Sequence, residues 1–105
     1  MKKYTIADSS ISGQGVFSTQ TILHKQIIGL AFVKKGDTGH PDKDYTRTEL
    51  GKFANHGTNP NMRLHTNGVE VYFVALRDVR KGEELTVDYG EFKWEGKRDF
   101  DTSLV

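Results

Sequence analysis

A dense run of polar side chains in the middle of the chain is the first place where chemistry is expected. Residues 52–61 read Lys-Phe-Ala-Asn-His-Gly-Thr-Asn-Pro-Asn, so that Asn55 and His56 are followed closely by two further asparagines. Amide groups and a histidine ring present both donors and acceptors, which suits a turn that binds a ligand. The same side chains can also hold a loop through local bonds to its backbone, with Pro60 fixing its own φ. The run alone leaves a ligand-binding turn and an architectural turn open.

A Gly13-Gln14-Gly15 triplet near the start of the chain is the second candidate. Paired glycines let a backbone turn tightly and approach a ligand closely. Ser18 stands where a dinucleotide-binding fingerprint has its third glycine, and no helical pattern follows, which excludes a Rossmann site. Taken alone, the triplet favours an ordinary turn.

A tyrosine near the C-terminal end is the third candidate. Residues 82–90 read Gly-Glu-Glu-Leu-Thr-Val-Asp-Tyr-Gly, which places Tyr89 at the end of a strand-like segment. On its own Tyr89 is an aromatic residue at the end of a strand. Its role therefore depends on the motifs that accompany it.

The residue types give little support to metal or nucleophile chemistry. The chain has no Cys, which excludes a thiolate zinc site, an iron–sulfur cluster and a cysteine nucleophile. No Gly-x-Ser-x-Gly motif of a serine hydrolase occurs. None of the four histidines forms an i, i+4 helical pair with a carboxylate, so we interpret them as surface or structural residues and expect no metal: His24, His40, His56 and His65.

Short strands must position these motifs. Alternating or β-branched and aromatic clusters predict strands at residues 4–7, 15–19, 27–33, 62–65, 69–76 and 85–89. The pair Asn67-Gly68 predicts a hairpin closed by a type I′ turn. Only Tyr45 to Phe53 is predicted to be helical, over one or two turns, and Lys34 to Asp44 is predicted to be a surface loop. These elements predict an all-β or β-rich α+β fold.

The composition limits the size of the protein and its partners. The 105 residues, 35% of them hydrophobic, predict a single domain over residues 1–105 with a modest core. Lys and Arg number 15 against 14 Asp and Glu, so no direct binding of nucleic acid is expected. The longest apolar run, Ile27 to Val33, is far shorter than the roughly 20 residues of a membrane span, and the N-terminus has no signal-peptide core. We expect an intracellular protein that is neither secreted nor bound to a membrane.

Taken together, the three motifs resemble those of the SET-domain protein lysine methyltransferases. The Gly-x-Gly triplet, the Asn-His-(three residues)-Pro-Asn box and the Gly-Glu-Glu-Leu-Thr-Val-Asp-Tyr-Gly segment occur in the order of that family. The resemblance covers Tyr4 to Trp94, with residues 95–105 as a tail, and the short length is similar to that of the small stand-alone SET proteins of viruses and bacteria. It implies a mainly β, β-clip-like fold of several short sheets with little helix, closed by a C-terminal pseudoknot.

The resemblance also implies an activity. SET-domain enzymes transfer a methyl group from S-adenosylmethionine to the ε-amine of a lysine in a protein substrate, leave S-adenosylhomocysteine, and need no metal for this step. A histone tail is one candidate substrate, the cytoplasm or a host-cell nucleus is the implied location, and a homodimer is compatible with the family. Two other classes stay open, namely a non-catalytic SET-like module that binds peptide or cofactor and a β-rich structural protein without cofactor affinity.

Roles carry over from the family residue by residue. The implied cofactor-binding residues are Gly13, Gln14, Gly15, Lys52, Asn55 and His56, with Trp94 or Phe92 stacking on the adenine. Tyr89 is implied as the catalytic residue, which either orients the substrate amine or deprotonates it. Tyr45 and Val87 are implied as walls of the substrate channel, although Tyr45 is equally well explained as the aromatic start of a helix.

Some positions depart from the family pattern. Gly57 stands where Ser is usual, which removes one expected side-chain hydrogen bond. Val87 stands where many members have the Phe or Tyr that tunes the product, so the number of methyl groups added is not predicted. The segment between Val33 and Tyr45 is very short. Its aspartates are interpreted either as part of a solvated loop or as residues that attract a basic peptide: Asp37, Asp42 and Asp44.

Overall fold

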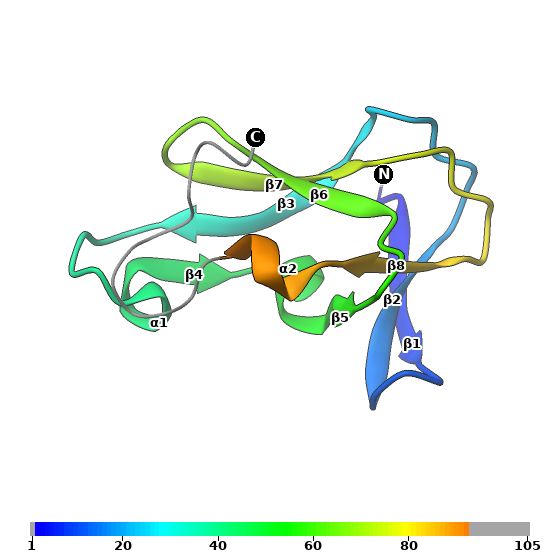
Figure 1. The fold of residues 1–105 in the computed structure, drawn as a ribbon, viewed down its shortest axis with the longest axis horizontal. Coiled ribbons are helices and arrows are strands. Elements are labelled where there is room, and N and C mark those ends of the chain that lie inside the picture. The colour runs from blue at the N-terminus through cyan, green and yellow to red at the C-terminus, as the bar shows by residue number, and fades with distance from the viewer. Residues whose placement is uncertain (1, 93–105) are drawn as a thin grey trace.

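The structure is a computed structural model that describes residues 2–92. The strands in this range are β1 (Tyr4–Asp8), β2 (Gln14–Ser18), β3 (Ile27–Lys34), β4 (Tyr45–Arg47), β5 (Asn55–His56), β6 (Met62–Thr66), β7 (Glu70–Ala75) and β8 (Glu84–Val87) (Figure 1). The helical elements are α1 (Pro41–Asp44), α2 (Glu49–Phe53) and the 3-10 helix η1 (Tyr89–Phe92). The expected mainly β fold of several small sheets with little helix is confirmed. No helix in residues 2–92 has the length and apolar character that a membrane crossing requires.

The first sheet has the strand order β1-β2-β8-β5. The strands β1 and β2 form a hairpin in which Asp8 pairs with Gln14. Strand β8 then pairs antiparallel with β2 on one side and parallel with β5 on the other. Strand β8, the last strand in the part of the chain that the structure describes, therefore lies between the N-terminal hairpin and β5.

The second sheet has the order β4-β3-β7-β6 and contains the predicted hairpin of β6 and β7. The type I′ turn predicted there is wrong. Residues 67–69 connect β6 to β7, one residue more than the type I′ loop has, and of the Asn67-Gly68 pair only Gly68 has a positive φ, of 101°. Instead, Asn67 Oδ1 accepts the N–H groups of Val69 and Glu70 at 3.0 and 2.8 Å, because a longer loop can be held by a side chain rather than by two left-handed residues.

The helix predicted for residues 45–53 is only partly correct. Residues Tyr45–Arg47 form strand β4, because the free edge of β3 offers backbone groups with which they pair. The helix begins after Thr48, whose Oγ1 accepts the N–H of Gly51 at 3.2 Å as an N-cap. A Cβ built at Gly51 would overlap the carbonyl of Ala31, so this glycine allows α2 to lie directly on β3.

The segment between β3 and β4 is held by one buried carboxylate. Asp44 is fully buried, and its two oxygens accept bonds from the Thr38 N–H and Oγ1 and from the Gly39 N–H, each at 2.8 Å. The predicted loop therefore contains a short helix, α1, that ends on an internal anchor. Because the Asp44 carboxylate is buried and hydrogen-bonded inside the fold, it is not available at the surface to attract a basic peptide.

One hydrophobic cluster draws on both sheets and on α2. Phe32 of β3 and Phe73 of β7 meet edge to face with ring centroids 6.0 Å apart. Leu50 of α2 and Leu85 and Val87 of β8 are fully buried in the same cluster. Burial of Leu85 and Val87 anchors one face of β8 in the core. This anchoring sets the positions of the residues that come directly before and after the strand.

Candidate active site

The three motifs found in the sequence come together around β8. This strand pairs Val16 of β2 with Leu85 and Asn55 of β5 with Thr86. The chain then continues from Val87 into η1, which begins at Tyr89. The sheet therefore brings the Gly-x-Gly turn, the Asn-His pair and the terminal tyrosine into one region.

The Asn55 side chain links β5 to the Gly-x-Gly turn. It is 8% exposed, and its Nδ2 lies 3.2 Å from the carbonyl oxygens of both Ser12 and Gln14. The same nitrogen lies 3.1 Å from Ser9 Oγ and 2.9 Å from Glu84 Oε2. Ser9 Oγ in turn donates to the Glu84 carboxylate, whose two oxygens are 2.9 and 2.8 Å away. These contacts form one polar cluster of Ser9, Asn55 and Glu84 below the turn.

The two glycines of the triplet serve different purposes. Gly13 has a φ of 44°, in the left-handed region that the turn between β1 and β2 requires, and an added Cβ there would meet no atom within 4 Å. Gly15 is buried, and a Cβ built on it would overlap the Glu84 carboxylate and lie 3.0 Å from both Asn55 Nδ2 and Ser9 Cβ. Gly15 is therefore the position at which the backbone must approach the polar cluster closely.

Tyr89 is held in place by hydrogen bonds to Ala54 and His56. Its hydroxyl donates to the Ala54 carbonyl at 3.0 Å, and its backbone N–H donates to His56 Nδ1 at 3.1 Å. The two rings pack with centroids 5.1 Å apart. Because His56 Nδ1 accepts a bond, the neutral ring carries its proton on Nε2. Asp88 Oδ1 lies 3.9 Å from the same Nδ1, and the two groups form an ion pair only when the ring is protonated.

This arrangement can orient an amine and stabilise positive charge. The phenol oxygen of Tyr89 and the Ala54 carbonyl oxygen lie within one hydrogen bond of each other, while the Tyr89 side of the pair is 46% exposed. Two oxygen dipoles that are fixed in advance favour a partial positive charge placed beside them. The predicted position of Tyr89 in a strand is wrong in detail, because β8 ends at Val87 and Tyr89 begins a 3-10 helix.

Comparison with known proteins gives the family. The sequence model of the SET domain matches residues 33–90, more than half of the chain and a range that includes Asn55, His56 and Tyr89. The chain belongs to the SET-domain family. Among sequence relatives, the histone-lysine N-methyltransferase set9 of Aspergillus oryzae is 54% identical over 41 residues, which are 38% of this chain and 7% of that protein. This SET domain thus spans a small part of the length of the curated relatives it matches.

Solved structures agree with the SET-domain assignment. A Plasmodium falciparum protein described as a candidate histone methyltransferase has a TM-score of 0.66 and 26% identity, over 90% of this chain and 99% of that one. A humanized mutant of the Chaetomium thermophilum Polycomb Repressive Complex 2, bound to the inhibitor GSK126, has a TM-score of 0.69 over 86% of this chain and 15% of that one. At 17% identity, the second likeness supports the fold alone. The viral or bacterial stand-alone type stays a prediction.

The remaining predicted site residues of this SET domain have varied positions. Tyr45, at the start of β4, is 8% exposed, and Val87 is fully buried in the core cluster. Lys52 is exposed on α2, with its Nζ 5.5 Å from the centroid of the Phe53 ring. Roles for these residues in a channel or a cofactor site stay predictions. The Phe92 side chain, Trp94 and the tail of residues 95–105 lie outside the described residues.

The missing serine after the Asn-His pair has a structural reason. A Cβ built at Gly57 would lie 2.6 Å from Thr86 Oγ1 and 2.8 Å from Thr86 Cβ. Gly57 N–H donates to the Val87 carbonyl at 3.0 Å, which holds this close approach. The space of the usual serine side chain is therefore occupied by Thr86 in this SET domain.

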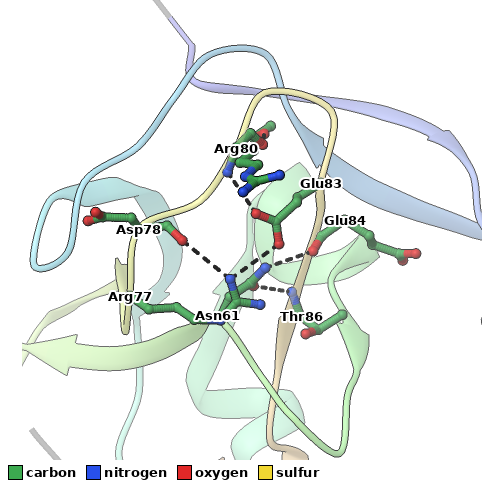
Figure 2. A network of polar contacts seen from close by, with 8 residues as sticks. Asn61, Arg77, Asp78, Arg80, Glu83, Glu84 and Thr86 are labelled. Atoms are coloured by element: carbon green, nitrogen blue, oxygen red, sulfur yellow. Dashed lines mark hydrogen bonds and ion pairs between the residues drawn. The ribbon is translucent and has the colours of Figure 1, made fainter.

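Asn61, the last residue of the polar box, is an architectural residue. It is 2% exposed, its Nδ2 donates to the Glu84 carbonyl at 2.9 Å, and its Oδ1 accepts the Thr86 N–H at 2.8 Å (Figure 2). The side-chain amide thus pairs with β8 as a neighbouring peptide group would. The architectural reading of the box holds for Asn61.

Two cluster residues were missed at the level of the sequence, namely Ser9 and Glu84. Neither lies within a motif that we assigned to the cofactor, and they are 75 residues apart in the chain. One feature of the sequence could have pointed to Glu84. It is a charged residue at the start of a strand whose other residues are apolar or β-branched.

The turn that leads into β8 gives a prediction about pH. Glu83 Oε1 accepts the Arg80 N–H at 2.7 Å, and its Oε2 lies 3.3 Å from Arg77 Nη1 (Figure 2). The backbone bond from Arg80, assisted by Arg77, lowers the pKa of the Glu83 carboxyl below its ordinary 4.5. A lowered pKa stabilises the fold at pH values above the unfolded pKa, and that stabilisation is lost as pH falls through the folded pKa.

We therefore expect Glu83→Gln to be less stable than the wild type at neutral pH, with a difference that shrinks in acid. Urea unfolding of both proteins between about pH 7 and about pH 3 measures this difference. A difference that stays constant over that range, or that grows in acid, would contradict the assignment.

Proposed function

We propose that this SET domain is a protein-lysine N-methyltransferase that uses S-adenosylmethionine as its methyl donor. The observation that carries the proposal is the bond from the Tyr89 hydroxyl to the Ala54 carbonyl, directly beside the Asn55-His56 pair. A phenol and a carbonyl fixed together are the groups that a methyl transfer to an amine needs. The printed names of the sequence relatives support the same activity.

The residues present fit such a cofactor. Asn55 Oδ1 accepts no hydrogen bond from residues 2–92, although the residue is 8% exposed and its Nδ2 is fully engaged. A buried acceptor without a protein donor calls for a donor from elsewhere, and the amino group of S-adenosylmethionine is such a donor. Asn55, His56 and the Gly13 to Gly15 turn would hold the cofactor, with Lys52 as the cationic side chain assigned to it.

S-adenosylmethionine, when bound, supplies a methyl group on a positively charged sulfur. The protein has to bring a neutral lysine amine in line with that methyl group, and alignment of this kind can supply up to roughly 7–11 kcal/mol of the barrier. A free lysine has a pKa of about 10.4, and an apolar channel disfavours its charged form. Tyr45 and Val87, both buried, are the proposed apolar walls of that channel.

Tyr89 is proposed to orient the amine rather than to deprotonate it. Its hydroxyl hydrogen is engaged with the Ala54 carbonyl, and a phenol oxygen also has lone pairs that can accept a hydrogen bond. A lone pair can accept an amine N–H and so direct the nitrogen lone pair toward the methyl group. Use of Tyr89 as a base would first require removal of the proton that this bond holds.

The proposed substrate is a lysine within a protein, and a histone is the first choice. The sequence relatives are named as histone-lysine methyltransferases, which supports an intracellular and nuclear place of action.

The test is a transfer assay with S-adenosylmethionine labelled on its methyl group. The purified protein is incubated with core histones and, separately, with a cell lysate, and Tyr89→Phe is run beside it. Label on lysine that depends on Tyr89 is the expected result. Binding of cofactor without any transfer would favour a non-catalytic module, and absence of cofactor binding would refute the proposed function.

A further inference from the structure

We infer that Glu84 is a positioning residue for the cofactor site, which holds the Asn55 amide and the Gly-x-Gly turn together as one unit. This inference rests on the proposed function, because the group it positions is the Asn55 acceptor assigned to the cofactor. Glu84 itself faces the turn from the start of β8 and is not proposed to touch substrate or cofactor.

The first argument is the direction of the hydrogen bonds. An ionised carboxylate can only accept, so it admits the Nδ2 side of Asn55 and repels the Oδ1 side. The Glu84 Oε2 to Asn55 Nδ2 distance of 2.9 Å is the shortest of the four contacts that this nitrogen makes. Because bonds to a charged acceptor are roughly twice as strong as neutral ones, Glu84 dominates the orientation of the amide. Asn55 Oδ1 is thereby turned away from the cluster.

The second argument is the link to the turn. Ser9, at the end of β1, donates its hydroxyl to the Glu84 carboxylate and accepts the Ile11 N–H at 2.9 Å. Asn55 Nδ2 reaches the same serine and the carbonyls on either side of Gly13. One carboxylate thus connects β5, β8 and the backbone of the Gly-x-Gly turn. Its removal would release the turn and the amide at the same time.

The third argument is that the fold makes room for this carboxylate. Gly15 lies so close to it that any Cβ at that position would overlap it. A residue needed only to begin a strand would require no such clearance in the neighbouring strand. The glycine that makes room for the Glu84 side chain therefore indicates that the carboxylate must lie next to the turn.

The experiment compares binding of S-adenosylhomocysteine, the unreactive product, by calorimetry in the wild type, Glu84→Ala and Glu84→Gln. We expect Glu84→Ala to weaken binding at least about tenfold, since it removes a charged acceptor from a partly buried group. Glu84→Gln keeps one amide oxygen that can accept from Asn55 but loses the charge, so it should recover part of the affinity. The matched control is Glu83→Ala, at the adjacent residue, which should lower stability without changing affinity.

A second measurement tests the positioning of the Asn55 side chain without relying on the affinity for S-adenosylhomocysteine. In the NMR spectrum, the Asn55 side-chain amide protons should exchange slowly with water in the wild type, and much faster in Glu84→Ala or, if that variant does not fold, in Glu84→Asp, whose shorter side chain draws the carboxylate away from Asn55 Nδ2. This readout needs no cofactor, so it tests the positioning even if the proposed function fails. Affinity in folded Glu84→Ala equal to that of the wild type, equal losses in Glu84→Ala and Glu83→Ala, or unchanged amide exchange would overturn the inference.

Discussion

Replacement of Tyr89 by Phe is expected to lower methyl transfer at least about tenfold, equivalent to roughly 1.4 kcal/mol of activation free energy, while cofactor affinity stays the same. The phenyl ring keeps the packing against His56, at 5.1 Å between centroids, and the backbone bond to His56 Nδ1 is unaffected. What is lost is the oxygen that lies beside the Ala54 carbonyl. Steady-state kinetics with calorimetry of S-adenosylhomocysteine binding measure the two quantities.

The size of this effect follows from preorganisation. Loss of one preorganised oxyanion-hole donor typically costs a factor of about 10²–10³ in turnover, so the tenfold loss expected here is a lower bound. Glu83→Gln, which alters the turn before β8, is the comparison for general destabilisation. Turnover in Tyr89→Phe that equals the wild type would remove the hydroxyl from the mechanism, and a matching loss of affinity would assign it to binding instead.

Gly15→Ala is expected to destabilise the fold by about 1–3 kcal/mol, the usual cost of forcing an extra carbon into a packed site, and to weaken cofactor binding strongly. The added Cβ would overlap the Glu84 carboxylate and press on Asn55 Nδ2 and Ser9 Cβ, each 3.0 Å away. The backbone of β2 is paired on both sides, with β1 and with β8, so it cannot move aside freely. Urea unfolding and S-adenosylhomocysteine calorimetry test the two effects separately.

Gly68→Ala provides the control for loss of stability alone. Gly68 has a φ of 101° in the hairpin loop of the other sheet, and an added Cβ would meet no atom within 4 Å. A left-handed backbone costs an alanine roughly 1–2 kcal/mol, without a change near the cofactor residues. If Gly15→Ala and Gly68→Ala affected affinity to the same extent, the close approach at Gly15 would have no special role.

Strands were predictable from the sequence where the hydrophobic pattern matches the burial of the side chains in the structure. Where the prediction of a strand failed, the failure has a physical cause. The segments of β1, β3, β6 and β7 were recognised because side-chain alternation and β-branched residues are local properties. The pairing of Tyr45–Arg47 with β3 and of Asn55–His56 with β8 was not predictable, since it depends on an edge that distant residues supply. Propensity around residue 45 favoured a helix, and the free edge of β3 outweighed it.

The candidate site was predictable only as far as its motifs reach. Asn55, His56, Tyr89 and the Gly13 to Gly15 turn were chosen from the sequence, and the fold brings them to one region. Glu84 and Ser9 are of common types, and their contact exists only once β1, β2 and β8 are assembled. Gly57 departs from the family motif, and the position of Thr86 explains why a side chain is missing there.

The central place of β8 has a consequence for how the protein is made. Ser9 and Glu84 are 75 positions apart, and the sheet of β1, β2, β8 and β5 cannot close until β8 has left the ribosome. Contacts between such distant positions are formed late and slowly, because a long loop must first be closed. The hairpin of β1 and β2 therefore gains its β8 partner only after residues 84–87 have been synthesised. A nascent chain that stops before residue 84 has the glycine turn and the Asn-His pair but no strand to join them.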